Sequence, residues 1–196
     1  MRVIVVGATG TIGRAVVEAL TPRHEVIAVS HRQGAMRVDL ADSQSIDRMY
    51  RAIGNVDAVI SAAGKARFGA FADLTDEDFA LGLGNKLMGQ VNLVRQGLAW
   101  IADGGSFTLT AGFLARHPSP GSTAISLVNA ALEGFVGAAA LDVPRGIRVN
   151  VVSPPWVTET LQALGRDPSP GTAAAVVARA YVRSLEGSET GAVITP

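Results

Sequence analysis

Apolar residues follow two different spacings along the chain, and the two alternate from one end to the other. Short runs rich in Val and Ile are typical of strands buried on both faces of a parallel sheet. Longer segments with an apolar residue at every third or fourth position are typical of helices that cover such a sheet. The alternation therefore predicts an α/β fold over residues 1–196: one domain with a single doubly wound parallel sheet and helices on both faces.

The element boundaries follow from these spacings and from breaks at Gly and Pro. Strands are expected at residues 3–6, 25–29, 36–38, 56–60, 105–110, 147–152 and 191–194. Helices are expected at residues 14–20, 43–53, 75–100, 122–141 and 172–185. Asp42 or Ser43 can cap the second helix and Thr75 the third, because short polar side chains accept hydrogen bonds from unpaired helix N–H groups. The proline-rich stretch 154–171 is expected to be irregular.

The segment from Gly7 to Gly13 lies between the first strand and the first helix and has the spacing G-x-x-G-x-x-G. Glycines allow backbone N–H groups to approach a pyrophosphate, and the positive end of the helix dipole favours its negative charge. The segment therefore predicts a nucleotide phosphate site, with an ordinary glycine-rich surface turn as the alternative.

The second predicted strand ends in Ser30-His31-Arg32. In dinucleotide-binding folds an acidic residue at this place binds the ribose 2′-hydroxyl, whereas a basic residue accommodates a 2′-phosphate. Ser30 brings no repelling carboxylate, and Arg32 can form charge-assisted hydrogen bonds with a phosphate. These residues favour NADP over NAD; the alternative is that His31 and Arg32 are solvated turn residues.

Composition removes several functional classes. The 196 residues are 48% hydrophobic and 17% charged with zero formal net charge, so no electrostatic footprint for nucleic acid or an anionic membrane is present. The absence of cysteine excludes disulfides and thiolate catalysis, and the three histidines lack the spacing of metal ligands. No segment is expected to span a bilayer and no secretory signal is recognised at the start, so a cytoplasmic location is expected.

Several segments, taken in order, resemble the short-chain dehydrogenase/reductase family across almost the whole chain. They are the glycine turn at 7–13, Asp39-Leu40, the run 61–64 (Ser-Ala-Ala-Gly, where the family often has Asn-Asn-Ala-Gly) and residues 146–154, GIRVNVVSP. The resemblance implies the strand order 3-2-1-4-5-6-7 and a nicotinamide cofactor. The glycine spacing is closer to the atypical branches of the family than to T-G-x-x-x-G-x-G.

The resemblance also implies which residues bind the cofactor. The pyrophosphate would lie against the glycine turn, the adenine against Asp39-Leu40, the ribose beside residues 62–64, and the nicotinamide amide near residues 154–157. Pro155 departs from the family, which usually has glycine there. With the residues after the second strand, the expected cofactor-binding set is Gly7, Thr9, Gly10, Thr11, Ile12, Gly13, Ser30, His31, Arg32, Asp39, Leu40, Ala62, Ala63, Gly64, Pro154 and Val157.

The catalytic pair of the family is missing. In family members a Tyr-x-x-x-Lys motif supplies a tyrosine as general acid/base and a lysine that lowers its pKa and binds the ribose. Aligning residues 130–135 with the segment that usually follows this motif places Ile125 at the tyrosine and Asn129 at the lysine. Neither side chain can perform the family's chemistry. The family's serine at the end of the fifth strand corresponds approximately to Thr110.

At Lys86 the chain has an ionisable side chain where the family has an uncharged one. Residues 86–93, KLMGQVNL, resemble the family's Asn-Leu-x-Gly-x-x-Asn-Leu, so Lys86 stands at the place of an active-site asparagine. Its ammonium either reaches solvent along the helix or enters the cleft, where it can bind the ribose, water or an anionic ligand. Imidazoles titrate near neutral pH, which suits His117 to proton transfer. Lys86, Thr110 and His117 are the candidate catalytic residues, with Ser122 and Ser126 as further proton donors.

Three functions remain open at this point. The first is an NADP(H)-dependent oxidoreductase that acts on a small carbonyl or alcohol substrate with a non-standard proton relay. The second is a catalytically silent NADP(H)-binding sensor or regulatory protein, and the third is a protein whose site no longer binds a dinucleotide. Family members commonly pair through the long helices after the fourth and fifth strands, so a homodimer or homotetramer is expected, with no nucleic-acid, membrane or metal partner.

Overall fold

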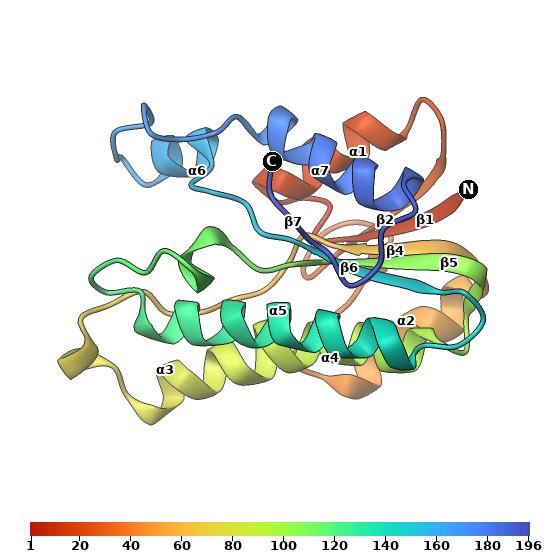
Figure 1. Cartoon of the computed structure of the whole chain (residues 1–196), viewed down its shortest axis with the longest axis horizontal. Helices are drawn as coiled ribbons and strands as arrows, with labels where there is room; N and C mark the ends of the chain where they lie inside the picture. Colours follow the sequence, from red (N-terminus) through yellow and green to blue (C-terminus); the bar gives the residue numbers. More distant parts are fainter.

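The computed structural model describes residues 1–196 and contains a seven-stranded parallel sheet between two layers of helices (Figure 1). The strands are β1 (Arg2–Val6), β2 (Glu25–Ser30), β3 (Met36–Arg37), β4 (Val56–Ser61), β5 (Ile101–Thr110), β6 (Arg148–Val152) and β7 (Val193–Ile194). The α-helices are α1 (Thr11–Leu20), α2 (Ser43–Ile53), α3 (Asp76–Leu81), α4 (Gly89–Gly97), α5 (Thr123–Asp142), α6 (Thr158–Ala163) and α7 (Ala174–Glu186). Two short 3-10 helices, η1 (Phe71–Asp73) and η3 (Phe113–Ala115), and one π-helical segment, η2 (Gly82–Met88), complete the set.

The strand order is β3-β2-β1-β4-β5-β6-β7, which confirms the predicted order and the α/β fold class. All neighbouring strands are parallel. The register aligns the last residues of the central strands, because Val6 pairs with Ser61 and Thr110 pairs with Val152. The chain therefore leaves the sheet at neighbouring points along one edge, and the strand order reverses there between β1 and β4.

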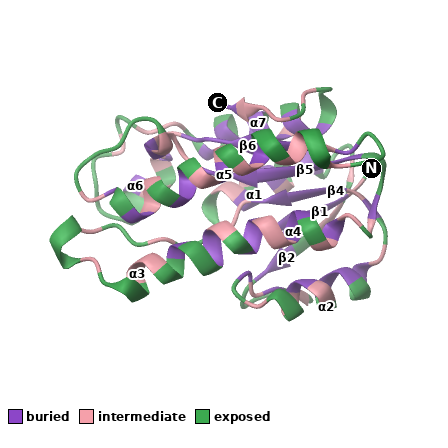
Figure 2. Cartoon of the chain, turned by 60° about the horizontal axis from the view of Figure 1, so that its bottom comes forward, coloured by how far each residue is buried: buried purple, intermediate pink, exposed green.

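Strand β1 shows why the sheet is buried on both faces. Ile4 and Val6 belong to the core cluster shared with α2, α4 and α5, whereas Val3 and Val5 belong to the cluster shared with α1 and α7. Each of these side chains is at most 1% exposed, and burying one contributes about 1.5–3 kcal/mol. Figure 2 shows the same pattern in the central strands β1, β4 and β6, which are mostly buried, and exposed outer faces on the helices.

The predicted helix at residues 75–100 is not continuous. Thr75 caps α3 as predicted, because the Asp78 backbone N–H donates to Thr75 Oγ1 over 3.3 Å. The next seven residues, Gly82–Met88, adopt π-helical geometry before α4 begins. Such segments inside helices occur frequently at functional sites, and this one includes Lys86.

Two other expectations need correction. The proline-rich stretch is not wholly irregular, because it contains α6. Strand β5 begins at Ile101 rather than at residue 105, since Ile101 already pairs with Val56.

Helix α5 is 20 residues long with a mean hydropathy of 1.6, so by length and composition it could cross a membrane. Its inner side packs on the sheet through Leu132 and Val136. Core helices of soluble proteins pass the same test, so this finding is weak evidence for a membrane span.

Gly89→Ala and Gly84→Ala form a matched pair that tests how closely α4 approaches the loop after β3. A Cβ at Gly89 would lie 2.7 Å from the backbone oxygen of Leu40, whereas a Cβ at Gly84 would meet nothing within 4 Å. Gly89→Ala is expected to lower the free energy of unfolding by about 1–3 kcal/mol, because backbone has to move. Gly84→Ala should raise it by up to about 1 kcal/mol through helix propensity. Urea denaturation measures both, and equal stabilities of the two variants would contradict the close contact.

Candidate functional site

Three cavities adjoin one another along the carboxyl edge of the sheet. The apolar cavity, about 310 Å³, lies where β4, β5 and β6 end. The turn cavity, about 240 Å³, lies over the glycine turn, and the basic groove, about 530 Å³, lies beyond it. Residues 62–64 line both the apolar and the turn cavities, while Thr9, His31 and Lys65 line both the turn cavity and the basic groove. The three therefore form one continuous cleft.

The glycine turn requires glycine for steric reasons. Gly7 has a φ of +85°, and a Cβ there would lie 2.7 Å from Ala62 O; a Cβ at Gly13 would lie 2.0 Å from Gly7 O. Gly10 is the N-cap residue of α1, and no side chain caps this end of the helix. The first backbone N–H groups of α1 thus lack an intrahelical partner. Among the predicted turn residues, Gly7, Thr9 and Gly10 line the turn cavity and Ile12 lines the apolar cavity, whereas Thr11 and Gly13 line neither.

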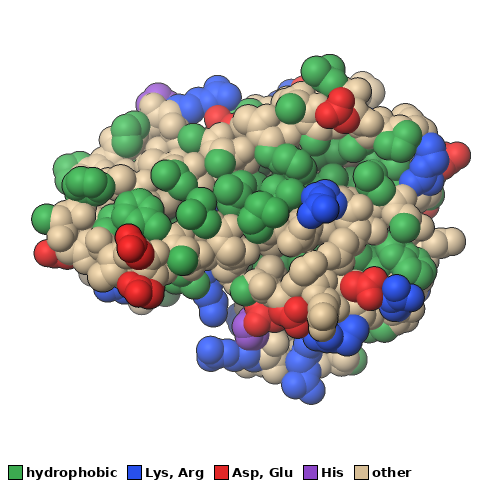
Figure 3. Space-filling view, turned by 90° about the horizontal axis from the view of Figure 1, so that it is seen from below, with side chains coloured by type: hydrophobic (Ala, Val, Ile, Leu, Met, Phe, Trp, Pro, Cys, Tyr) green, Lys and Arg blue, Asp and Glu red, His purple; other side chains and the backbone are tan.

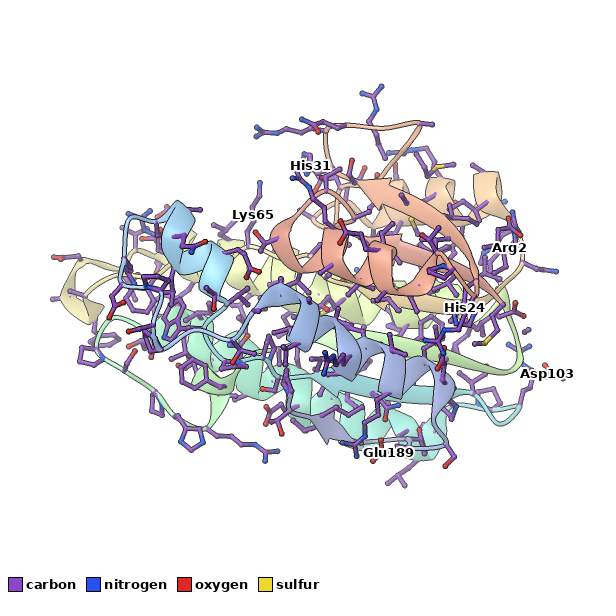
Figure 4. The ribbon with its side chains drawn as sticks, turned by 90° about the horizontal axis from the view of Figure 1, so that it is seen from above. Arg2, His24, His31, Lys65, Asp103 and Glu189 are labelled. Carbon is purple, nitrogen blue, oxygen red and sulfur yellow. The ribbon has the colours of Figure 1, made fainter.

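Basic side chains dominate the groove next to the turn. Arg14, His31, Arg32 and Lys65 line it together with Thr9 and Gln33, and no acidic residue does. Figure 4 shows His31 and Lys65 near the same end of α1. Ser30 does not face the groove: it is 3% exposed, and its hydroxyl hydrogen-bonds with the backbone of Gln33. Ser30 therefore shapes the turn that presents Arg32.

Asp39-Leu40 divides between two roles. Leu40 lines the turn cavity with Val38, where they provide an apolar surface. Asp39 is not part of this lining, because its carboxylate accepts a hydrogen bond from the Ala41 N–H over 3.0 Å. Leu40 thus borders the cavity, whereas the expected contact of Asp39 with an adenine stays a prediction.

Lys86 enters the apolar cavity instead of reaching solvent. The residue is 8% exposed, and Nζ donates to the backbone oxygen of Ala111 over 3.0 Å. A Cβ at Gly64 would lie 2.7 Å from Lys86 Cγ, so the loop after β4 packs directly on the lysine stem. Burial disfavours the charged amine and lowers the pKa of Lys86 from 10.5 to about 8.

Asn129 and Ile125, both on α5, also line this cavity. Asn129 is 1% exposed, and its Oδ1 is buried without a hydrogen-bond partner. Buried polar atoms are usually hydrogen-bonded, so an unpaired amide oxygen in a cavity wall is a site for a ligand or water. Ile125 adds only apolar surface.

The other two candidate catalytic residues are placed differently from the expectation. Thr110 lines the apolar cavity, but its hydroxyl hydrogen-bonds to Ser61 O and to the Tyr181 hydroxyl, 2.6 Å away on α7. His117 is exposed and does not line the cavity; its ring stacks on Phe113 with centroids 6.4 Å apart. Ser122 and Ser126 hydrogen-bond to each other outside the cavity lining. Lys86 is therefore the one candidate whose side-chain hydrogen-bonding group is presented to the cavity.

Pro154 and Val157 line the apolar cavity as expected, with Trp156 and Thr160. Trp156 stands directly before an excursion of the chain, residues 158–171, that leaves and returns at one narrow neck. The neck is closed by two backbone hydrogen bonds, from Thr172 N to Trp156 O over 2.8 Å and from Thr158 N to Thr172 O over 3.0 Å. Arg166 in this excursion lies 5.9 Å from the Trp156 ring centroid and 5.7 Å from that of Phe68.

Sequence reasoning missed four residues that build the site. Lys65 follows directly on residues 62–64, and Arg14 follows Gly13, so both stand next to recognised motifs. Asn85 holds the Lys65 backbone N–H through its Oδ1, over 2.8 Å. Gln90, one helical turn after Lys86, donates from Nε2 to Thr110 O over 3.0 Å and accepts from Thr110 N over 2.8 Å. A single sequence gives no signal for the last two contacts, because each joins positions 20 residues apart.

Comparison with known proteins gives consistent matches. The enoyl-(acyl carrier protein) reductase family model matches residues 7–195. Protein lin1944 from Listeria innocua is 38% identical with a TM-score of 0.94, covering 100% of this chain and 98% of that chain. A small-chain dehydrogenase in complex with NADPH is 26% identical with a TM-score of 0.88, covering 100% and 96%. Oxidoreductase UcpA of Escherichia coli K12 is 28% identical over 155 residues, 74% of this chain and 59% of UcpA. The chain thus spans about three fifths of the length of the first curated relatives it matches.

The lowered pKa of Lys86 makes a pH-dependent contribution to stability. Its pKa is about 8 in the folded protein and about 10.4 in an unfolded chain. Between these values the unfolded chain binds more protons, so the free energy of unfolding should rise with pH. We expect the stability of the wild type relative to Lys86→Met to increase by about 3 kcal/mol from neutral pH to about pH 10.5.

Guanidinium denaturation of both proteins across this range measures the effect. Lys65→Met is the matched control, since the groove in which Lys65 lies is open to solvent, and it should follow the wild-type profile. Parallel profiles for the wild type and Lys86→Met would contradict the burial of the amine.

Proposed function

The chain belongs to the short-chain dehydrogenase/reductase family, and we propose that it is an NADP(H)-dependent oxidoreductase acting on a small carbonyl or alcohol substrate. In this proposal Lys86 takes over the proton-handling role that the family assigns to its tyrosine. The observation that carries the proposal is the order of environments along the cleft. A basic groove, a glycine turn at a helix N-terminus and an apolar cavity with one buried amine follow one another.

The residues present fit the cofactor. The glycine turn is a cradle that a Cβ would fill, since side chains at Gly7 and Gly13 would meet backbone atoms at 2.7 and 2.0 Å. Its unpaired N–H groups and the α1 dipole favour a pyrophosphate. Arg14, Arg32 and Lys65 would bind a 2′-phosphate by charge-assisted hydrogen bonds, which supports NADP over NAD. A solved structural relative at 26% identity is described as a complex with NADPH.

Lys86 can supply the proton that a carbonyl oxygen takes on reduction. NADPH, when bound, supplies the hydride. With a pKa of about 8, the amine is protonated at neutral pH and close to the pH at which it releases the proton. The amide of Asn129 can hold the same substrate oxygen through hydrogen bonds. In the oxidising direction, the neutral amine would accept the proton from an alcohol.

A second candidate function is a silent NADP(H) sensor. It is favoured by Ile125 at the tyrosine position and by the engagement of the Thr110 hydroxyl away from the cavity. Under this alternative Lys86 only holds the end of β5 through Ala111 O. The two functions share the cofactor and differ in whether the protein turns over.

Cofactor preference is tested by isothermal titration with NADPH and NADH. We expect tighter binding of NADPH, and we expect Arg32→Ala and Lys65→Met each to weaken it by about tenfold or more with little effect on NADH, because each removes a hydrogen bond between charged groups. Arg95→Ala, on α4 away from the cleft, serves as the control. Equal affinities for the two cofactors would refute the assignment of the groove, and no binding of either would refute the proposed function.

Turnover is tested with NADPH and a panel of small ketones and aldehydes, including 2-oxo acids. We expect the reductive rate to fall as the pH rises through about 8, since reduction needs protonated Lys86. Lys86→Met should lower kcat/KM by about 10²–10⁴-fold while the Kd for NADPH stays unchanged. Cofactor binding without any turnover across the panel would favour the sensor instead.

We also propose that the chain forms a homodimer or homotetramer through the outer faces of α4 and α5. Figure 3 shows hydrophobic side chains gathered on this side of the molecule. A groove of about 250 Å³ between the two helices is lined by Val94, Leu98 and Phe135 among others. On α5 the same face continues to Leu127, which is 45% exposed.

Light scattering after size exclusion measures the assembly. Leu127→Asp should give monomers, because it places a carboxylate in the buried centre of the contact. Leu164→Asp, at a leucine that follows α6 and is 58% exposed, should leave the mass unchanged. A monomeric wild type at micromolar concentration would contradict the proposal.

A further inference from the structure

The buried amine of Lys86 has no counter-charge in the protein. None of the residues that line the apolar cavity is acidic, and Lys86 takes part in no ion pair. Its single hydrogen bond, to Ala111 O, uses one of the three N–H groups of an ammonium. Lys86 is one of only two lysines in the chain, and the other, Lys65, also lies in the cleft.

The lysine cannot easily leave this place to find water. The backbone of Gly64 packs against the aliphatic part of the Lys86 side chain, so closely that a Cβ added at Gly64 would lie 2.7 Å from Lys86 Cγ. Gln90 fixes the backbone from which the side chain starts, because Nε2 donates to Lys86 O over 3.1 Å. Buried charges are normally paired. The two remaining N–H groups of Lys86 are therefore available to oxygen atoms that a ligand brings into the cavity.

The rest of the cavity selects for a flat apolar group. Phe113 and Trp156 meet edge to face there, with ring centroids 6.3 Å apart, and Ile12, Ile125 and Val157 complete the apolar lining. Two side chains outside the cavity lining contact the Trp156 ring: the Arg166 Cζ lies 5.9 Å from its centroid, and the centroid of the Phe68 ring lies 6.2 Å from it. Besides Lys86, the polar side chains of the lining that form no hydrogen bond within the protein are the Asn129 amide and the Thr160 hydroxyl.

We propose that the apolar cavity binds a 2-oxo or 2-hydroxy acid with a flat, apolar side chain, and that such an acid is the substrate of the oxidoreductase. The two free N–H groups of Lys86 face the vicinal oxygens of such a molecule, one from the carboxylate and one from the neighbouring carbonyl. The Nδ2 group of Asn129, which lines the cavity, would donate to a remaining carboxylate oxygen, and the flat side chain of the acid would lie against Phe113 and Trp156. As the identity of the substrate, this inference rests on the proposed function.

The reaction balances with the cofactor already proposed. A 2-oxo acid, a reduced nicotinamide and one proton give the 2-hydroxy acid and the oxidised nicotinamide. The hydride forms the new C–H bond at the carbonyl carbon, and the proton from Lys86 Nζ forms the new O–H bond. The lysine then recovers a proton from solvent. Until it is reprotonated, the neutral amine keeps two N–H groups, one for Ala111 O and one for the carboxylate.

The test compares phenylglyoxylate with acetophenone, which has a methyl group in place of the carboxylate. Binding to the whole protein is measured by titration calorimetry, with and without saturating NADP⁺, so that no turnover occurs. We expect phenylglyoxylate to bind at least about tenfold more tightly than acetophenone at neutral pH, since a charge-assisted hydrogen bond is worth more than one such factor. The preference should fade as the pH rises through about 8, where Lys86 loses its charge.

Variants separate the apolar cavity from the basic groove. Lys86→Gln and Lys86→Met should abolish the preference for the acid, and Asn129→Asp should weaken its binding by placing a carboxylate in the cavity. Melting temperatures identify any variant that fails to fold. Lys65→Met is the matched lysine control and should keep the preference.

Retention of the preference in both Lys86 variants, or its loss in Lys65→Met, would overturn the inference, as would equal binding of acid and ketone by the wild type. If NADPH binds normally in that case, the proposed oxidoreductase stands with another substrate class. Failure of NADPH to bind overturns the oxidoreductase itself, whatever the acid does.

Discussion

Two side chains, one helical turn apart, hold the chain at the point where β5 leaves the sheet. Gln90 pairs with both the N–H and the carbonyl of Thr110, and Lys86 donates to the carbonyl of Ala111. A strand that ends inside the protein leaves peptide groups without a ladder partner, and leaving them unpaired would cost about 1–3 kcal/mol each. These bonds to α4 and η2 satisfy those groups, and they fix the floor of the apolar cavity.

The same turn of helix therefore has a structural role and presents a chemical group. In the π-helical segment, Lys86 lies on the sheet-facing side together with Gln90, and Gly89 lets this part of the helix approach Leu40. An amide could have satisfied Ala111 O without bringing a charge into a cavity that contains no acid. Lysine does so only at the expense of a lowered pKa. The proposed proton-handling role of Lys86 rests on this buried amine without a counter-charge.

The sequence predicted the layered sheet because a strand that is buried on both faces can be recognised from its own residues. In β1 the apolar run includes Ile4 and Val6, which face one layer of helices, and Val3 and Val5, which face the other. The sequence located the glycine turn for the same reason, since that motif is local, but it left open whether the Lys86 ammonium reaches solvent or enters the cleft. It could not predict that the Thr110 hydroxyl turns to Tyr181, 71 residues away, or that Asp39 binds its own turn. It placed His117 in the cleft because loop position was known but side-chain direction was not. Direction depends on contacts between distant segments.

The neck at Trp156 and Thr172 separates two parts of the protein that can change at different rates. Residues 158–171 leave the sheet-bound chain and return to it through two backbone hydrogen bonds, which do not depend on what the excursion contains. Insertions or replacements there that keep Glu159, whose carboxylate accepts from Ala174 N at the start of α7, would alter the wall around Trp156 and Thr160 while β6 and α7 keep their places. Changes confined to residues 158–171 can therefore alter which ligand the apolar cavity prefers, while the sheet and the glycine turn stay the same.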